Sequence, residues 1–166
     1  MKRLFFFIGV LIISFQAVGQ NYQLHAVYMY QFIKYIKWPD NTSSGDFVIG
    51  VLGESPATEH LQKMADTKKA GARNIVLKQF NSPSEVKQTH MLFIGKGATN
   101  DMASVIEHTK NTNTLLVSEE EGFGLEGSNI NFVVRNGRLV FELNQSAMDR
   151  ENLKVSAELA KLAIVI

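Results

Sequence analysis

The 166-residue sequence contains no cysteine. Disulfide bonds, thiol catalysis and metal sites with cysteine ligands are therefore excluded. A lipid anchor on a cysteine at a signal-peptide cleavage site is excluded for the same reason. The fold must be held together by an ordinary hydrophobic core.

Apolar runs long enough to cross a bilayer are also lacking. The run at residues 4–15 has about a dozen residues, whereas about 20 are needed to span the hydrocarbon core. The basic residues KR precede it at positions 2–3 and the small residues AVG follow at positions 17–19, which is the three-part pattern of a cleaved signal peptide. We predict a signal peptide at residues 1–19 and export to the periplasm, with an uncleaved anchor as the alternative.

Neither sign of charge is in excess. The sequence has 17 Lys and Arg residues against 16 Asp and Glu residues, and removal of Lys2 and Arg3 lowers the first number to 15. A chain with this balance has no general attraction for nucleic acid or for an anionic membrane. Repeats, linkers and low-complexity segments are absent too, so residues 20–166 are expected to form one domain.

Among the features that are present, a hairpin constrains the fold most. Asn136-Gly137 is a preferred type I′ turn sequence and lies between two apolar-rich runs. Counting outward from the turn pairs the two strands and separates their side chains into two faces, because side chains alternate across a strand. A shift of one residue would mix the two sets, so the pattern and the turn agree on the register.

The two faces of the predicted hairpin differ in chemistry. The apolar face comprises Ile130, Phe132, Val134, Leu139, Phe141 and Leu143. The opposite face comprises Asn129, Asn131, Glu142 and Asn144, with Val133 and Val140 nearer the turn. We expect the apolar face to be buried and the polar face, with the Gly-Phe-Gly loop before it, to be available for recognition.

The rest of the chain alternates between helical and strand-like segments. Residues 22–38 have the apolar spacing of a helix, which Pro39 ends. Strands are predicted at residues 47–52, 75–80, 91–94 and 114–117, and helices at residues 56–68, 82–88, 98–110 and 146–152, with a last helix that begins after Ser156 and carries Leu159, Leu162, Ala163 and Ile166. Strands joined by helices are typical of parallel βαβ units. The predicted fold is a single-domain α/β sandwich with a mostly parallel sheet built from βαβ units, followed by a C-terminal antiparallel hairpin and helix.

Two glycine-containing motifs approach known signatures and fail. GESPA at residues 53–57 has an alanine where a nucleophile elbow has its second glycine, so Ser55 is interpreted as a helix cap. GKG at residues 95–97 lacks the third glycine of a dinucleotide fingerprint and is interpreted as a turn.

Titratable residues show no catalytic or metal-binding pattern either. His25, His60, His90 and His108 lack metal-ligand spacing and are expected to be exposed or partly buried. EEE at residues 119–121 lacks the alternating ligands of a calcium loop and is expected to be a solvated loop, with a partner-facing patch as the alternative. Asn131 opposite Glu142 has no visible base or nucleophile beside it. No catalytic residue, metal or cofactor is predicted.

Three blocks of the sequence can be compared with a known family. The first is YMYQFIKYIKWP at residues 28–39; the second comprises VS at 117–118, GF at 122–123, Gly127, INF at 130–132 and FELN at 141–144; the third is LKVS at 153–156 with Leu159 and LA at 162–163. Together these blocks resemble the YfiR-like family of periplasmic regulators. The resemblance extends over nearly the whole predicted mature chain, from about residue 26.

The resemblance implies an exported α/β protein that forms a homodimer and restrains an inner-membrane signalling protein. In the best-known branch of the family the partner is a diguanylate cyclase, which connects the family to cyclic-di-GMP and biofilm formation, and an outer-membrane lipoprotein withdraws the restraint. A histidine kinase could replace the cyclase without a change of fold. Some relatives use disulfides, so the lack of cysteine argues against redox control of that kind here.

Six residues are candidates for contact with a partner or ligand. Phe123 is either presented outward from its glycine-flanked loop or anchors that loop in the core. Trp38 is either a core residue or part of a contact surface at the helix end. Asn129, Asn131, Glu142 and Asn144 are either solvated polar ends or bind a ligand or the backbone of a partner.

Two functions follow from these observations. The leading hypothesis is a regulatory binding protein without catalysis. The alternative is a periplasmic small-molecule-binding protein that feeds a membrane sensor, and it requires a cavity beside Asn131 and Glu142. An enzyme would need a catalytic cluster assembled from distant residues.

Overall fold

The structure is a computed structural model that describes residues 22–40, 44–99 and 101–166. The predicted signal peptide at residues 1–19 lies outside this range. The helices are α1 Tyr22–Tyr35, α2 Ala57–Thr67, α3 Met102–Thr109, α4 Phe123–Glu126, α5 Gln145–Arg150 and α6 Ala157–Ala160, with a 3₁₀ turn, η2, at Pro83–Glu85. The strands are β1 Ile36–Lys37, β2 Phe47–Leu52, β3 Lys69–Ala70, β4 Arg73–Phe80, β5 Met91–Ile94, β6 Leu115–Ser118, β7 Ile130–Arg135, β8 Arg138–Leu143, β9 Lys154–Val155 and β10 Ile164–Val165.

Eight strands of the described chain form one sheet in the order β10-β8-β7-β6-β5-β2-β4-β3. The five strands from β4 to β7 in this order are mutually parallel, whereas β8 is antiparallel to β7 and β3 is antiparallel to β4. Strand β10 runs parallel to β8, and β1 with β9 forms a separate two-stranded ribbon. The predicted single-domain α/β fold, with a mostly parallel sheet and a C-terminal antiparallel hairpin, is confirmed.

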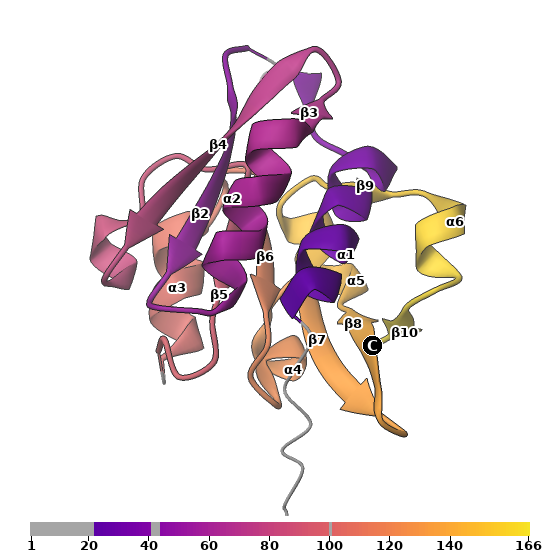
Figure 1. Ribbon diagram of the computed structural model, residues 1–166. Coiled ribbons are helices and arrows are strands. Elements are labelled where there is room, and N and C mark those ends of the chain that lie inside the picture. Colours follow the sequence, from indigo (N-terminus) through magenta and orange to yellow (C-terminus); the bar gives the residue numbers. More distant parts are fainter. Residues whose placement is uncertain (1–21, 41–43, 100) are drawn as a thin grey trace, which may run out of the picture.

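Helices cover both faces of the sheet, and α1 and α2 lie side by side over one of them (Figure 1). Alternate residues of the central strand β5 show the division. Met91 and Phe93 pack in the cluster beneath α1 and α2, while Leu92 and Ile94 pack in a second cluster with α3 and α4. A continuous apolar strand such as β5 is expected where helices cover both faces.

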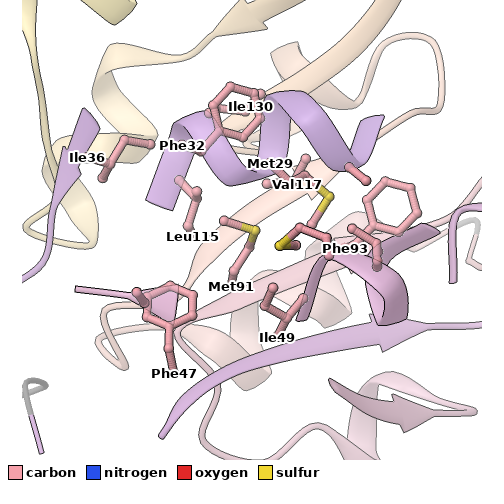
Figure 2. Close-up of a cluster of buried hydrophobic side chains, with 14 of the residues drawn as sticks. Met29, Phe32, Ile36, Phe47, Ile49, Met91, Phe93, Leu115, Val117 and Ile130 are labelled. Atoms are coloured by element: carbon pink, nitrogen blue, oxygen red, sulfur yellow. The ribbon is translucent and has the colours of Figure 1, made fainter. Parts of the chain in front are cut away.

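The larger cluster lies between α1 and the centre of the sheet. Figure 2 shows Met29, Phe32 and Ile36 on one side, with Met91, Phe93, Leu115 and Val117 of β5 and β6 opposite them. Met29, Phe32 and Ile36 are spaced by three and four residues, so they form one stripe along the helix and its continuation. This stripe explains why α1 is held firmly on the sheet.

The hairpin has the predicted register. Ile130 pairs with Leu143, Asn131 with Glu142, and Phe132 with Phe141. Asn136 and Gly137 have φ angles of 52° and 72°, as both central residues of a type I′ turn require. Phe132 and Phe141 are buried, as predicted. The Phe132 ring stacks on Phe32 at a centroid distance of 5.8 Å, and the Phe141 ring meets Phe32 edge-on at 5.1 Å.

The C-terminal helix is shorter than predicted. Helix α6 spans Ala157–Ala160, and the residues after it form β10 at the edge of the sheet. Leu162, expected on the helix face, is 68% exposed. The reason is that β8 offers an open row of backbone groups, and Ile164 and Val165 are β-branched residues that suit pairing with it. The last residue is also bonded to the end of β8, since Ile166 N–H donates to Leu143 O over 2.9 Å.

Other helices are also shorter than predicted, and the helix predicted at residues 82–88 is reduced to the 3₁₀ turn η2. Helix α1 ends at Tyr35 rather than Trp38, because Ile36 pairs with Val155 in the β1–β9 ribbon. Helix α3 begins at Met102, because the Asp101 side chain accepts the Ser104 N–H over 2.9 Å and caps it there. In the described part of the chain, no helix combines the length and the apolarity needed to cross a membrane.

Candidate functional site

The carboxyl edge of parallel strands is where open α/β sheets usually hold ligands, at the point where the strand order reverses. Here that point lies between β2 and β5, and it is filled by packing. A Cβ atom on Gly53 would lie 2.6 Å from Ala98 Cβ, and one on Gly95 would lie 3.0 Å from Ser55 Cβ. Ser55 Oγ accepts the Ala57 N–H over 3.1 Å at the start of α2. Both glycine motifs therefore serve close packing and helix initiation.

Phe123 anchors the loop between β6 and β7. It begins α4 directly after Gly122 and is only 5% exposed, in the cluster that contains Leu92 and Leu116. Gly122 and Gly127 flank α4 with φ angles of 92° and 115°, which residues other than glycine rarely adopt. The outward presentation of Phe123 is therefore wrong, and the loop-anchor alternative holds. A ring of this size gains more free energy by burial in this cluster than by exposure to water.

The polar face of the hairpin lies under α4 and is not solvated. Asn131 is 0% exposed. Its Nδ2 donates to Glu142 Oε2 over 3.1 Å, and its Oδ1 accepts from Ser118 Oγ over 2.8 Å. Ser128 Oγ lies 2.9 Å from Ser118 Oγ and continues the network. The expectation of a solvated face is wrong at Asn131, because α4 covers it and its amide is bonded within the protein.

Asn129 is also buried, at the start of the same strand. Its Oδ1 accepts the Leu116 N–H over 2.7 Å, which joins the loop before β7 to β6. No partner for its Nδ2 is found among the described residues. Asn129 is therefore not a solvated end either. Its side-chain oxygen takes the place of a backbone acceptor between β6 and β7.

Asn144 connects two short helices. Its Oδ1 accepts the Ala147 N–H over 2.9 Å and caps α5. Its Nδ2 donates to Gly124 O of α4 over 2.9 Å. Asn144 therefore positions α4 on the hairpin.

Glu142 is the member of the polar face that reaches the surface. Its side chain is 15% exposed, and its Oε1 lies 3.3 Å from Arg135 Nη2. Gly124 comes so close that a Cβ atom there would lie 2.6 Å from Glu142 Oε2. Beside this contact, Leu125 of α4 is 81% exposed. The surface above the network thus combines a carboxylate, an arginine and a solvent-facing leucine.

Trp38 lies at the amino ends of the parallel strands, away from the hairpin residues described above. Its ring is buried edge-on to Phe47 at 5.1 Å, and its Nε1 donates to His90 O over 3.0 Å. Phe47 and His90 stand at the amino ends of β2 and β5, whereas α4 follows the carboxyl end of β6. The structure therefore brings together Phe123, Asn129, Asn131, Glu142 and Asn144 but leaves Trp38 apart from them.

Sequence reasoning missed a buried pair between His25 and Glu119. His25 Nε2 lies 3.2 Å from Glu119 Oε2, and the two side chains are 0% and 1% exposed. Glu119 also accepts the Lys96 N–H over 2.9 Å. The expectation of a solvated loop is wrong at Glu119, because its carboxylate finds these donors in the interior. The missed signal is the spacing of His25 with Met29, Phe32 and Ile36, which places His25 in the buried stripe of α1.

Tyr22 stacks on this pair with its ring centroid 5.0 Å from that of His25. Partial burial and the nearby Glu119 carboxylate raise the pKa of the Tyr22 hydroxyl above its ordinary value. Both causes disfavour the phenolate. Tyr22 and the His25–Glu119 pair therefore connect the start of α1 to the loop between β6 and α4.

The hollows on the described surface include the following four. They have volumes of about 790 Å³ between α1 and α2, 340 Å³ at the β1–β9 ribbon, 250 Å³ beside Trp38, and 200 Å³ beside Glu119 and Arg135. None of these four is lined by Asn131 or Glu142. Within the described residues, no three His, Asp or Glu side chains gather so that they could hold a metal ion.

The fold and this arrangement can be compared with known proteins. The model of the YfiR/HmsC-like family matches residues 22–164, which is nearly the whole described chain. The chain belongs to this family, and this membership suggests a periplasmic regulatory role. No curated protein sequence matches the chain closely enough to count as a relative.

Two solved structures share the fold. A conserved domain protein from Vibrio cholerae O1 biovar El Tor strain N16961 superposes with a TM-score of 0.61 at 9% identity. The ABC domain in complex with L-Trp from Streptococcus pneumonia superposes with a TM-score of 0.57 at 11% identity. Each match covers 87% of this chain but only 60% of the other. At these identities the likeness shows the architecture alone.

Proposed function

We propose that this chain is exported through a cleaved signal peptide at residues 1–19 and restrains an inner-membrane signalling protein, a diguanylate cyclase or a sensor kinase, without catalysis of its own. The observation that carries the proposal is the family match over residues 22–164. A homodimer, and release of the restraint by an outer-membrane lipoprotein, belong to the same proposal. Cyclic-di-GMP level and biofilm formation are then its outputs.

The geometry of the hairpin supports binding rather than catalysis. Asn131 and Ser118 are bonded to each other in the interior, and the Glu142 carboxylate is engaged by Asn131 and Arg135. A general base or nucleophile needs to reach a substrate atom, whereas these groups face one another. They hold α4 in place, which is the role expected of a support beneath a contact surface.

We propose the exposed side of α4 as that contact surface. Leu125 is its apolar centre, and Glu142 with Arg135 forms a charged border. An exposed apolar side chain next to polar groups is typical of protein interfaces. Phe123, Asn129, Asn131 and Asn144 act beneath it as positioning residues, and Trp38 contributes at the separate 250 Å³ hollow.

The experiment is co-purification of the chain with membrane proteins from its own host, together with deletion of its gene. We expect a membrane cyclase or kinase to co-purify, and cyclic-di-GMP or sensor output to change on deletion. Leu125→Asp should abolish the association without unfolding the protein, whereas Leu162→Asp, at another exposed leucine, should not. If deletion left cyclic-di-GMP, biofilm formation and sensor output unchanged, the proposal would be abandoned.

The alternative of a small-molecule-binding protein that feeds a membrane sensor required a cavity beside Asn131 and Glu142. The four hollows described above have other linings, and the Asn131 amide is bonded internally. The arrangement therefore favours the regulatory binding protein.

A further inference from the structure

The 790 Å³ hollow between α1 and α2 takes no part in the contacts described so far. Its lining extends over residues 23–31 of α1 and residues 60–68, which comprise the last part of α2 and the residue that follows it. Each of these stretches is about 12 Å long at 1.5 Å per residue, or slightly more than two helical turns. Helices α1 and α2 lie side by side (Figure 1). The hollow between them is named the α1–α2 groove from here on.

The floor of the α1–α2 groove is apolar. Ala26 and Met64 are buried there, and Val27 beside them is 50% exposed. A trough of this kind accepts the ridge of a third helix, because side chains at spacings of three and four fit between those of two neighbours. A small ligand would instead need a site that encloses most of its surface.

The walls of the groove are basic. Lys63 of α2 and Lys68, the residue directly after α2, line it together with His60, and the lining contains no Asp or Glu. The ammonium groups of Lys68 and Lys34 lie 5.8 and 6.0 Å from the ring centroid of Tyr30, on the α1 wall. Lys63 is paired with the exposed Glu59, whereas no described carboxylate lies within ion-pair distance of Lys68. Since the whole sequence has nearly balanced charges, this concentration of lysines is local.

We propose that the α1–α2 groove binds an acidic amphipathic helix of the partner protein. The apolar side of that helix packs on Val27 and Met64, and its carboxylates lie against Lys63 and Lys68. Complementary charge gives such a contact its orientation and raises its association rate. The inference rests on the proposed function, since it names the chemistry by which a membrane signalling protein is recognised.

The first test uses the purified chain and a synthetic helical peptide with leucine at positions i, i+3, i+4 and i+7 and glutamate on both flanks. A peptide with lysine in place of every glutamate is the control. Fluorescence anisotropy at low salt should show saturable binding of the acidic peptide and at least about tenfold weaker binding of the basic one, a difference of about 1.4 kcal/mol. Equal affinities, or no binding of either peptide, would overturn the proposal.

Variants of exposed residues locate the binding. Val27→Glu and Lys68→Glu should each weaken binding of the acidic peptide at least about tenfold, because one places a carboxylate on the floor and the other reverses a wall charge. Leu24→Glu is the matched control, since Leu24 is a similarly exposed residue of α1 outside the groove lining. Unfolding curves should show that all three variants remain folded. If Leu24→Glu had the same effect as Val27→Glu, the groove would not be the site.

The same variants separate this inference from the proposed function. If a membrane cyclase or kinase co-purifies with the unmodified chain and with Leu24→Glu but not with Val27→Glu or Lys68→Glu, both stand. If it co-purifies with all four proteins, the groove inference fails and the proposed function stands. If it co-purifies with none, the proposed function fails, and the groove is judged by the peptide alone. Binding to phosphatidylglycerol vesicles that Lys68→Glu abolishes, without binding of the acidic peptide, would assign the groove to a membrane surface and overturn the inference.

Discussion

Both faces of the β7–β8 hairpin are covered by helices away from the turn, but different interactions stabilise them. On one face, Phe132 and Phe141 pack against Phe32 of α1. On the other, Asn131 lies under α4 and bonds to Ser118 and Glu142. The apolar face follows the usual rule for a sheet, whereas the polar face is an interior hydrogen-bond network.

The difference shows that stability and specificity come from opposite sides of one ribbon. Each fully buried Phe contributes about 1.5–3 kcal/mol by leaving water. A hydrogen bond nets only about 1 kcal/mol, but an unsatisfied buried group costs about 1–3 kcal/mol. A register shift by one residue would therefore be penalised on both faces, since it would turn Asn131 toward the aromatic cluster.

The polar face also explains how a helix as short as α4 can be ordered. Four residues are too few for a helix to be stable by itself in water. Phe123 fixes α4 to the core, and Asn144 donates to Gly124 O. The short helix α4 and the hydrogen-bond network beneath it therefore depend on each other.

The strongest test of the comparison is Phe141→Asp. It removes a core ring and places a charge in the apolar cluster, so we expect a loss of more than about 4 kcal/mol in the free energy of unfolding. Urea unfolding followed by the fluorescence of Trp38, the single tryptophan, measures it. Val134→Asp is the control on the same face, because Val134 is 55% exposed near the turn; it should change stability by less than about 0.5 kcal/mol. An unchanged midpoint in Phe141→Asp would show that the apolar face is not the core face.

The sequence predicts the hairpin itself well, for a physical reason. Asn136-Gly137 determines the turn, and strict alternation over six residues of each strand determines which side chains share a face. Neither signal says what covers a face. Asn131 was expected in solvent because its cover, α4, is a four-residue helix with no periodicity to detect, and Phe123 between two glycines is compatible with either direction.

Longer-range contacts were hidden from the sequence in the same way. His25 and Glu119 are 94 positions apart, and only the spacing of His25 within the α1 stripe hinted at burial. The pattern after Ser156 suits a helix, yet residues 164–165 form β10 because β8 has an open edge that only the folded sheet presents. Local pattern predicted the longer helices and strands, whereas tertiary partners decided their ends, their cover and short elements such as α4 and β10.

A smaller effect is expected for His25→Leu, which tests the buried His25–Glu119 pair on the apolar side of the sheet. The substitution removes the His25 contact with the buried Glu119 carboxylate, and we expect a loss of about 3 kcal/mol. His108→Leu on α3 is the control, since His108 is exposed, and it should change stability by less than about 0.5 kcal/mol. Similar unfolding curves for the two variants would mean that the buried pair contributes nothing to stability.

Asn131→Leu tests the network on the polar face. Ser118 and Glu142 each lose a partner while volume is nearly conserved, so we expect a loss of about 2 kcal/mol. The exposed Asn74 offers the control Asn74→Leu, because its amide makes only a 3.4 Å contact with Asp46. The same urea titration applies. A gain of stability in Asn131→Leu would show that the polar face is maintained for recognition rather than for folding.

The smallest effect is expected for Gly124→Ala, which tests how closely α4 rests on the polar face. The new Cβ would lie 2.6 Å from Glu142 Oε2 and 3.0 Å from Ile166 Cδ1. Both atoms end flexible side chains, so the cost should be about 1 kcal/mol. A double-mutant cycle with Glu142→Ala isolates the contact: once the carboxylate is removed, Gly124→Ala should cost less than half as much. An equal cost in both backgrounds would mean that α4 does not rest on Glu142, and the network would then hold the strands together without positioning the surface above it.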